Sequence, residues 1–248
     1  MSRLLEEITK GEDKKINIIC IPYAGGGASM YFSWKDRIHP DVRLWAVQLP
    51  GREDRIMDKY YQAIEDVIPD LLVEVKELIE RTGKPYILFG HSMGAKIAFE
   101  LEKALEAIQM GSNLLIVSGS RAPHIPEPRP ICHLENKAFL DELNRFEGTP
   151  TEILKNKEMM SFFMPLLRAD FTMDETYVTE QTGKLSCPVV AFCGNQDAEA
   201  EESDMKQWEV YAEDFNIQIF EGKHFFVKTN IEKVVNTINE IVLAMLKE

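Results

Sequence analysis

The sequence predicts an α/β protein with a mostly parallel central sheet that helices cover on both faces. Two observations predict this fold class. Short apolar runs of strand length alternate along the chain with longer segments of helical periodicity. The most distinctive polar and glycine-rich motifs each follow one of these runs. Such alternation is typical of parallel sheets, whose functional residues gather beyond the carboxyl ends of the strands.

Length and composition predict one domain. The chain has 248 residues, of which 45% are hydrophobic, and this suffices for a single large α/β domain over residues 1–248. Its formal net charge of −13 argues against binding to nucleic acid and to anionic membranes. The segment from Met1 to Lys15 is charged throughout, so we expect no secretory signal, and no apolar run is long enough to span a membrane.

The cysteines indicate a reducing compartment. Cys20, Cys132, Cys187 and Cys193 lie far apart and form no C-x-x-C pair, so we expect free, mostly buried thiols in the cytoplasm. Cys132 beside His133 is a weak candidate metal pair without further ligands nearby in the sequence. We therefore expect no metal site.

The first half of the chain predicts three strands, each followed by a helix. The second helix shows apolar residues at helical spacing and ends before Gly83, and Ser29 is a plausible cap of the first. The strands are Ile16–Ile21, Arg43–Gln48 and Tyr86–Phe89, and the helices are Ser29–Ile38, Ile64–Thr82 and Ala95–Ala107.

The second half predicts three more strands and two helices in the same rhythm. The strands are Asn113–Gly119, Cys187–Cys193 and Asn216–Phe220, and the helices are Glu202–Glu213 and Asn230–Leu246.

A long segment at about 121–185 interrupts the alternation. An ordinary crossover needs far less chain, so we interpret this segment as a helical lid inserted over the active site. We expect its methionines and phenylalanines mostly to pack the lid onto the domain, and a few to line a channel for an acyl group. Its predicted helices are Asn136–Phe146, Thr151–Lys155 and Glu158–Asp170.

The segment Gly90-His91-Ser92-Met93-Gly94 predicts a nucleophilic serine. It joins a predicted strand to a predicted helix, the setting in which G-x-S-x-G forms a sharp turn that exposes the serine hydroxyl. Glycines are expected at the two flanking positions because crowding at such a turn leaves no room for side chains. The hydroxyl of Ser92 is therefore the candidate nucleophile.

His224 is the candidate general base. In this arrangement the chain order is serine, acid, histidine, and only His224 follows both the serine and the plausible acids. It lies in the loop after the strand Asn216–Phe220. His91 adjoins the serine and is expected to pack or to form part of the pocket wall. The remaining histidines, expected at the surface or in the lid, are His39, His124 and His133.

Asp197 is the best candidate for the acid that orients the base. It follows the strand Val189–Cys193, again beyond a carboxyl end. The same acidic loop offers rivals, for which surface charge and helix N-terminal charge are the alternative interpretation. The rivals are Glu199, Glu201 and Glu202, with Asp170 and Asp174 as weaker ones because they fall in the predicted lid.

Two backbone N–H groups are expected to bind the oxyanion that forms on the substrate. One is that of Met93, directly after the nucleophile, and the other belongs to the loop after an earlier strand, for which Tyr23–Gly27 fits. The competing interpretation of this loop is a dinucleotide site with Gly25-x-Gly27. Met30 stands where the third glycine of that motif would be, so we reject the interpretation as a dinucleotide site.

The motifs together resemble those of the type II thioesterases of non-ribosomal peptide and polyketide synthesis, within the α/β-hydrolase superfamily. The resemblance spans nearly the whole chain and implies an α/β-hydrolase fold with Ala24 as the second oxyanion donor. The matching segments are Pro22–Gly26, Leu49–Glu53, Gly90–Gly94, Asp197, His224–Phe226, Met160–Phe163 and Leu167–Asp170. Lys223 departs from the pattern, since the family usually has glycine before the histidine.

The resemblance implies an editing thioesterase. It would hydrolyse stalled or aberrant acyl and aminoacyl groups from the phosphopantetheine arms of carrier domains, through an acyl-enzyme on Ser92 and without a metal or other cofactor. We expect a monomer in the cytoplasm. The alternatives are a carboxylester or lipid esterase with the same triad, and a non-catalytic hydrolase-like binding protein.

Carrier domains are usually acidic, as this chain is, so we hypothesise a local basic rim where they dock. Scattered solubilising charge is the alternative interpretation for each residue. The candidates are Arg52, Arg55, Arg121, Arg129, Lys223 and Lys228.

Overall fold

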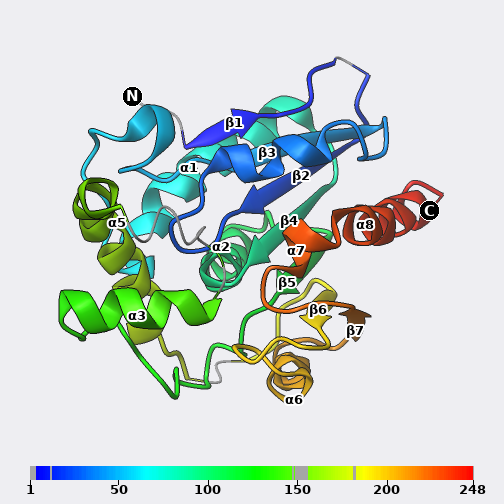
Figure 1. The fold of residues 1–248 in the computed structure, drawn as a ribbon. Coiled ribbons are helices and arrows are strands. Elements are labelled where there is room, and N and C mark those ends of the chain that lie inside the picture. The colour runs from blue at the N-terminus through cyan, green and yellow to red at the C-terminus, as the bar shows by residue number, and fades with distance from the viewer. Residues whose placement is uncertain (1–3, 12, 147, 149–155, 181–182, 248) are drawn as a thin grey trace.

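A seven-stranded sheet forms the centre of the molecule (Figure 1). The computed structural model describes residues 4–11, 13–146, 148, 156–180 and 183–247. The strand order is β1-β3-β2-β4-β5-β6-β7, and every neighbouring pair is parallel except β1 with β3. The strands are β1 (Leu5–Glu7), β2 (Ile16–Ile21), β3 (Val42–Val47), β4 (Tyr86–His91), β5 (Leu114–Ser118), β6 (Val189–Gly194) and β7 (Phe215–Phe220).

Helices cover both faces of the sheet, which confirms the predicted fold class. Successive residues of a strand point to opposite faces. Ile19 and Ile21 therefore join the core beneath α1 and α2, whereas Ile18 and Cys20 join the core on the other side, beneath α8. The first face carries α1 (Ile64–Thr82) and α2 (Met93–Ala107), and the second carries η1 (Ala28–Trp34), α7 (Phe226–Thr229) and α8 (Ile231–Met245).

The segment between β5 and β6, hereafter the insertion, contributes α3 (Asn136–Phe146) and α5 (Lys157–Thr176). Both lie at one side of the sheet, away from α8 (Figure 1). They pack on each other through their own small apolar cluster, which includes Phe139, Met164 and Phe171. The predicted helix Thr151–Lys155 lies outside the described residues.

Two expected elements need correction, and one strand was missed. Ser29 does not cap a helix: η1 is a 3₁₀ helix that begins at Ala28, and the Ser29 hydroxyl instead donates to Glu53 Oε1 at 2.6 Å. The predicted helix over Glu202–Glu213 is two short elements, α6 (Glu202–Lys206) and the 3₁₀ helix η3 (Gln207–Tyr211). Strand β1 was not predicted, because three residues in a charged segment carry no recognisable periodicity.

The register of the sheet places the signature loops together. Ile21 pairs with Gly90, and His91 pairs with Ser118. The chain that leaves β2, β4 and β5 therefore emerges at one edge of the sheet, as parallel strands require. All four cysteines are free, and Cys132 is the least buried of them. Within the part of the chain that the structure describes, no helix is both long and apolar enough to cross a membrane.

Candidate active site

The turn between β4 and α2 holds Ser92 in a strained conformation. Its φ of 54° and ψ of −122° are unusual for a residue with a side chain. A Cβ on Gly90 would lie 2.1 Å from the Gly94 carbonyl oxygen, and one on Gly94 would lie 2.2 Å from that of Ile21. The two glycines are thus required by contact with backbone atoms, which cannot move aside.

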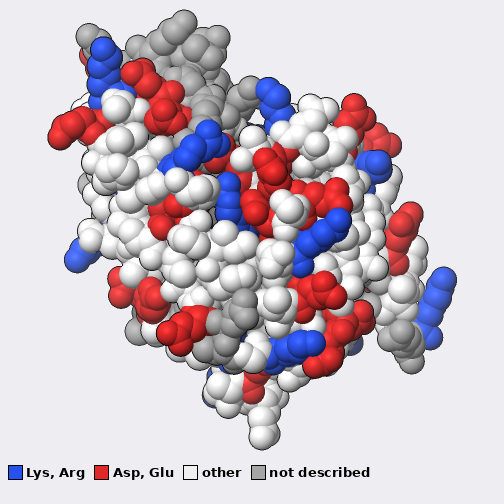
Figure 2. Space-filling model, turned by 90° about the horizontal axis from the view of Figure 1, so that it is seen from below, with Lys and Arg blue, Asp and Glu red and all other residues white. Residues whose placement is uncertain are grey.

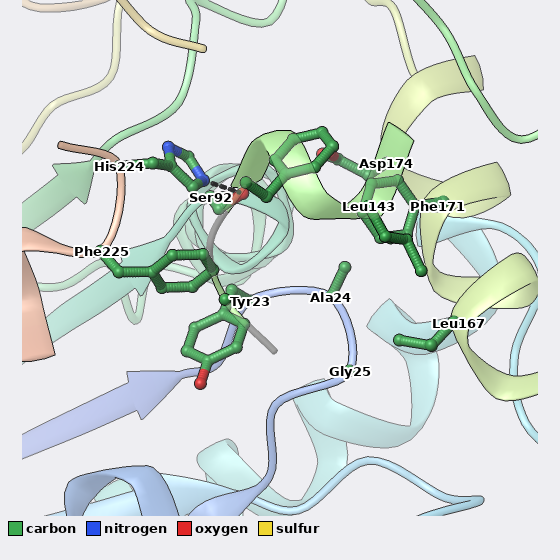
Figure 3. Close-up of a pocket in the computed structure, with 12 residues that line it drawn as sticks. Tyr23, Ala24, Gly25, Ser92, Leu143, Leu167, Phe171, Asp174, His224 and Phe225 are labelled. Atoms are coloured by element: carbon green, nitrogen blue, oxygen red, sulfur yellow. Dashed lines mark hydrogen bonds between the residues drawn. The ribbon is translucent and has the colours of Figure 1, made fainter. Parts of the chain in front are cut away.

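The structure brings Ser92, His224 and Asp197 into one hydrogen-bonded row, of which Figure 3 shows the contact between Ser92 and His224. Ser92 Oγ lies 3.1 Å from His224 Nε2, and His224 Nδ1 lies 2.9 Å from Asp197 Oδ2. The other oxygen of Asp197 accepts the N–H groups of Glu199 and Ala200, at 2.9 and 3.3 Å. Asp197 is therefore a fixed acceptor that sets the orientation of the imidazole.

The environment of His224 favours its protonated form. Burial by itself lowers the pKa of this imidazole, but the charge of Asp197, its hydrogen bond and the carboxylates of Glu199 and Asp174 together raise the pKa above the ordinary value of 6.5. An imidazole that gains a proton readily is suited to take one from a hydroxyl. Glu199 and Asp174, expected as rivals of Asp197, instead act on the base from a distance.

His91 is a buried neighbour of the row. Its Nδ1 lies 3.0 Å from Ser118 Oγ, and its ring packs 5.2 Å from that of His224. Burial, and then the nearby charge of His224, lower the pKa of His91 well below its ordinary value. It is therefore a neutral, fully buried packing residue, the first of the two positions that the sequence indicated.

The other rivals lie elsewhere. Glu201 is exposed, and Glu202 pairs with Lys206 at 2.6 Å along α6. Of the remaining histidines, His124 contacts Tyr211 Oη at 3.1 Å, and His133 is exposed. Since none of these touches Ser92 or His224, geometry selects Asp197 from the acidic loop, a choice that sequence spacing left open.

The loop after β2 lies beside the serine turn. Gly26 N–H donates to the Tyr23 carbonyl at 2.9 Å and closes a tight turn around Ala24 and Gly25, whose φ is 78°. Ala24 and Ser92 line the same cavity (Figure 3). Met93 is the first residue of α2, so its N–H has no partner within the helix. Ala24 thus lines the cavity, and Met93 directly follows the serine that lines it.

This loop is held by two residues whose roles the sequence did not reveal. Asp170 on α5 accepts the Gly25 N–H at 2.6 Å, and Arg52 donates to the Gly26 carbonyl at 2.9 Å. Arg52 and Asp170 also form a buried ion pair with each other, at 2.7 and 2.8 Å. Asp170 was a weak rival for the acid and Arg52 a rim candidate. No pattern in one sequence shows that residues 118 positions apart pair.

The cavity above Ser92 has two lobes. The larger, of about 130 Å³, is mostly apolar and runs between the loop and the insertion. The smaller, of about 30 Å³, is polar and contains the Lys96–Asp174 ion pair at 2.9 Å. The insertion supplies Leu143, Leu167 and Phe171 to the larger lobe (Figure 3). Most of its other apolar residues pack between helices, as expected, although Met159 and Phe162 are exposed.

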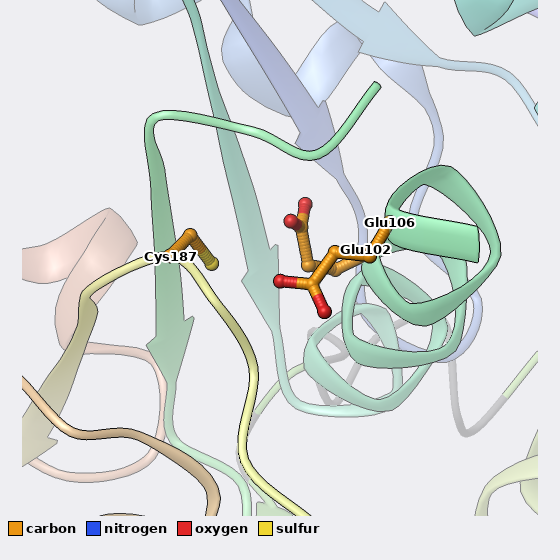
Figure 4. Close-up of side chains that lie close together, drawn as sticks. All are labelled: Glu102, Glu106 and Cys187. Atoms are coloured by element: carbon orange, nitrogen blue, oxygen red, sulfur yellow. The ribbon is translucent and has the colours of Figure 1, made fainter. Parts of the chain in front are cut away.

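One group of side chains could share a metal ion among the residues that the structure describes, and it lies far from Ser92. Glu102, Glu106 and Cys187 offer ligand atoms within 4.8 Å of one another (Figure 4). Glu102 stands ten residues along α2 from Ser92, about 15 Å by helical rise. Both its oxygens accept the Ser112 N–H, and Glu106 accepts the Ser186 N–H. These carboxylates tie α2 to the segments before β5 and β6.

The hypothesis of a basic rim is wrong for half of its members. Arg52 is 4% exposed and pairs with Asp170, and Arg121 pairs with Glu127 and Asp204. Arg55 pairs with Asp58 and is largely covered. The exposed candidates are Arg129, Lys223 and Lys228. On the face that Figure 2 displays, basic side chains are interspersed among acidic ones without a continuous basic band.

Comparison with known sequences gives matches over nearly the whole chain. The family described as "Thioesterase domain" matches residues 16–242. The chain is 33% identical over 230 residues to "Thioesterase PikA5" of Streptomyces venezuelae, covering 92% of this chain and 81% of that protein. It is 35% identical over 219 residues to "Gramicidin S biosynthesis protein GrsT" of Aneurinibacillus migulanus, covering 86% of this chain and 83% of that protein.

Solved structures give the same result. The fold is similar to that of YbtT, a type II thioesterase of the yersiniabactin pathway, with a TM-score of 0.87 and 28% identity over 95% of this chain and 96% of that one. It is also similar to ClbQ of the colibactin pathway, with a TM-score of 0.83 and 29% identity over 93% of this chain and 98% of that one. The hydrolase fold implied by the sequence motifs is therefore confirmed.

Proposed function

The chain belongs to the thioesterase domain family, among the type II thioesterases of non-ribosomal peptide and polyketide synthesis, and we propose that it removes acyl groups from carrier domains of such a synthetase. The substrate is a thioester on the phosphopantetheine arm, and the role is editing of stalled or wrongly primed carriers. The observation that carries the proposal is the hydrogen-bonded row from Ser92 through His224 to Asp197. It lies beneath a cavity that residues of the insertion help to line, and in this proposal the insertion serves as a lid.

In the first step Ser92 Oγ attacks the thioester carbonyl. His224 Nε2, 3.1 Å away, takes the hydroxyl proton, and Asp197 holds Nδ1–H and stabilises the imidazolium. The carbonyl oxygen becomes an oxyanion that accepts the N–H groups of Ala24 and Met93. When the carbon–sulfur bond breaks, the imidazolium gives its proton to the departing thiol, and the acyl group stays on Ser92.

In the second step water releases the acid. His224 accepts a proton from a water molecule as its oxygen attacks the acyl-enzyme, and the same N–H groups hold the second oxyanion. Collapse of this intermediate returns the proton to Ser92 Oγ and frees the carboxylic acid. Every proton moves between side chains of this chain, water and the substrate, so the proposed reaction needs no metal or other cofactor.

The carrier domain docks, in this proposal, at the mouth of the cavity beside Tyr23 and Phe225. Lys228 lies there, with its Nζ 5.7 and 5.4 Å from the centroids of the Tyr23 and Phe225 rings. It is exposed, as is Lys223 in the loop five residues earlier. Two lysines at the mouth of a site in a chain of net charge −13 offer a local attraction for an acidic partner. We expect one copy of the chain to suffice.

The deciding experiment compares substrates on one enzyme. Carrier domains loaded with short, long and aminoacyl groups are given to the protein beside p-nitrophenyl esters of the same acids. We expect the carrier thioesters to have the higher kcat/KM, and Ser92→Ala to lose turnover of both classes. A strong preference for the free esters over every carrier thioester would replace the editing role by that of an esterase. Turnover of neither class, with no covalent adduct on Ser92, would leave a binding protein.

A further inference from the structure

A buried ion pair joins three segments that the sequence keeps far apart. Arg52 follows β3, Asp170 lies on α5 of the insertion, and the loop Tyr23–Gly26 follows β2. Arg52 is 4% exposed and Asp170 is 1% exposed. The guanidinium binds both carboxylate oxygens, NH1 to Oδ2 at 2.7 Å and NH2 to Oδ1 at 2.8 Å. This two-point geometry is the strongest form of such a pair and fixes orientation as well as distance.

Both Arg52 and Asp170 also form a hydrogen bond with the backbone of the loop. Asp170 Oδ2 accepts the Gly25 N–H at 2.6 Å, and Arg52 NH1 donates to the Gly26 carbonyl at 2.9 Å. Gly26 N–H in turn donates to the Tyr23 carbonyl at 2.9 Å. The loop is therefore held at two successive residues, Gly25 and Gly26, directly after Ala24, the residue whose N–H faces the oxyanion in the proposed mechanism.

The same face of α5 builds the cavity wall. Residues three and four apart share a helix face, and Leu167 and Asp174, which both line the cavity, stand at these spacings from Asp170. Leu167 Cδ2 occupies the space that a side chain on Gly25 would need, 2.7 Å from an added Cβ. The insertion thus meets the loop through one polar anchor and one apolar contact on the same helix face.

We propose that Arg52 and Asp170 are positioning residues that hold the Ala24 N–H where the oxyanion forms, so that the insertion takes part in the reaction by setting the oxyanion hole. This inference rests on the proposed function, which assigns Ala24 as a donor. Neither residue touches the substrate. A displacement of about 1 Å at such a donor is enough to reduce turnover about 100-fold.

The test must separate positioning from stability. Replacing both members of a buried ion pair by apolar residues of similar volume often leaves a protein as stable as before. The double variant Arg52→Met/Asp170→Leu therefore removes both loop anchors without leaving a buried charge. Arg55→Met/Asp58→Leu is the matched control, because that pair stands in the same segment and Arg55 contacts the Gln48 carbonyl but no residue of the loop.

Activity is measured on p-nitrophenyl acetate, with active sites counted by a phosphonate that labels Ser92. We expect kcat per active site of the first double variant to fall about 10- to 100-fold, with little change in KM and no shift in the acid limb of the pH profile. Affinity for an alkylboronic acid, whose tetrahedral adduct on Ser92 places an oxygen in the hole, should fall in step. The control pair should stay within about twofold of the parent.

A kcat within about twofold of the parent, or a loss shared equally by the control, would overturn the proposal. If the double variant does not fold, Asp170→Asn tests the proposal instead. The asparagine keeps the side-chain volume and one acceptor oxygen of Asp170, but it breaks the two-point pair with Arg52. We expect about a tenfold loss for it, and a parental kcat would again overturn the proposal. Failure of the parent protein on carrier thioesters alone would end the proposed function but leave this result on the ester intact.

Discussion

Two buried aspartates, Asp197 and Asp170, support the candidate active site in different ways. Each is at most 4% exposed, accepts backbone N–H groups and faces one nitrogen base. Asp197 faces an imidazole, whose charge changes during a reaction, whereas Asp170 faces a guanidinium, whose charge does not. The comparison teaches that the role of a buried carboxylate depends on its partner. Asp197 can stabilise an imidazole that gains and loses a proton, whereas Asp170 can only fix the positions of the groups that it binds.

The largest expected effect is on turnover at Asp197. Asp197→Asn should lower kcat about 10⁴-fold, because an amide no longer holds the tautomer of His224 that accepts a proton at Nε2. The measurement is single-turnover hydrolysis of a carrier thioester. Asp170→Asn is the matched control and should lose far less. Equal losses in the two variants would mean that the two carboxylates do not differ in function.

Stability should show the reverse order. Asp170→Ala leaves Arg52 charged and buried without its partner, which we expect to cost about 3–5 kcal/mol of unfolding free energy. Asp197→Ala should cost less, since His224 can lose its proton and remain buried as a neutral ring. Urea unfolding at 25 °C measures both. An Asp197→Ala variant that is the less stable of the two would contradict the assignment of Asp170 to structure.

The pH profile should respond only on the Asp197 side. Burial lowers the pKa of His224, whereas Asp197 and, to a smaller extent, the charge of Glu199 raise it. The base must be neutral to act, so activity is lost as pH falls through this raised pKa. Glu199→Gln should lower the pKa and move the acid limb of kcat/KM to lower pH. The exposed neighbour variant Glu201→Gln should leave the limb in place, and an unmoved limb in Glu199→Gln would refute the electrostatic account.

The smallest effect is expected at a third aspartate that pairs with an arginine at the surface. Asp58 lies 2.9 Å from Arg55 Nε, but its side chain is 41% exposed. Exposed pairs contribute less than about 1 kcal/mol, so Asp58→Asn should unfold at nearly the parental urea concentration. A loss as large as that of Asp170→Ala would show that burial is not what separates the two pairs.

The sequence predicted the parts of this molecule that depend on local pattern. The spacing of apolar residues and the length of each segment predicted α1 and α3 with their observed bounds. The five residues Gly90–Gly94 predicted the turn at Ser92, because the crowding that requires glycine is a property of the turn itself. Strand β1 was missed because it is defined by pairing with β3 and by the N–H groups of Leu4 and Leu5 that donate to the Glu74 carboxylate, not by periodicity.

The site was predictable where the chain order of its members follows from the fold. His224 came from its place after the last strand, and Asp197 from its place after β6, although three acids of the same loop, Glu199, Glu201 and Glu202, could not be excluded. Arg52 was wrongly predicted to lie at the surface, because the charge of a side chain does not show whether it pairs with a buried carboxylate that is distant in the sequence. Nor could the reduced size of the basic rim be foreseen, since it depends on the partners of Arg55 and Arg121.

The loop anchor has a consequence for when activity arises. The Gly25–Asp170 hydrogen bond joins residues 145 positions apart, and the Ser92–His224 contact spans 132 positions. Contacts of such long sequence separation form late because the entropy of closing a long loop must be overcome first. We therefore expect hydrolysis to return only in the last kinetic phase of refolding, when β7 and α5 have both docked.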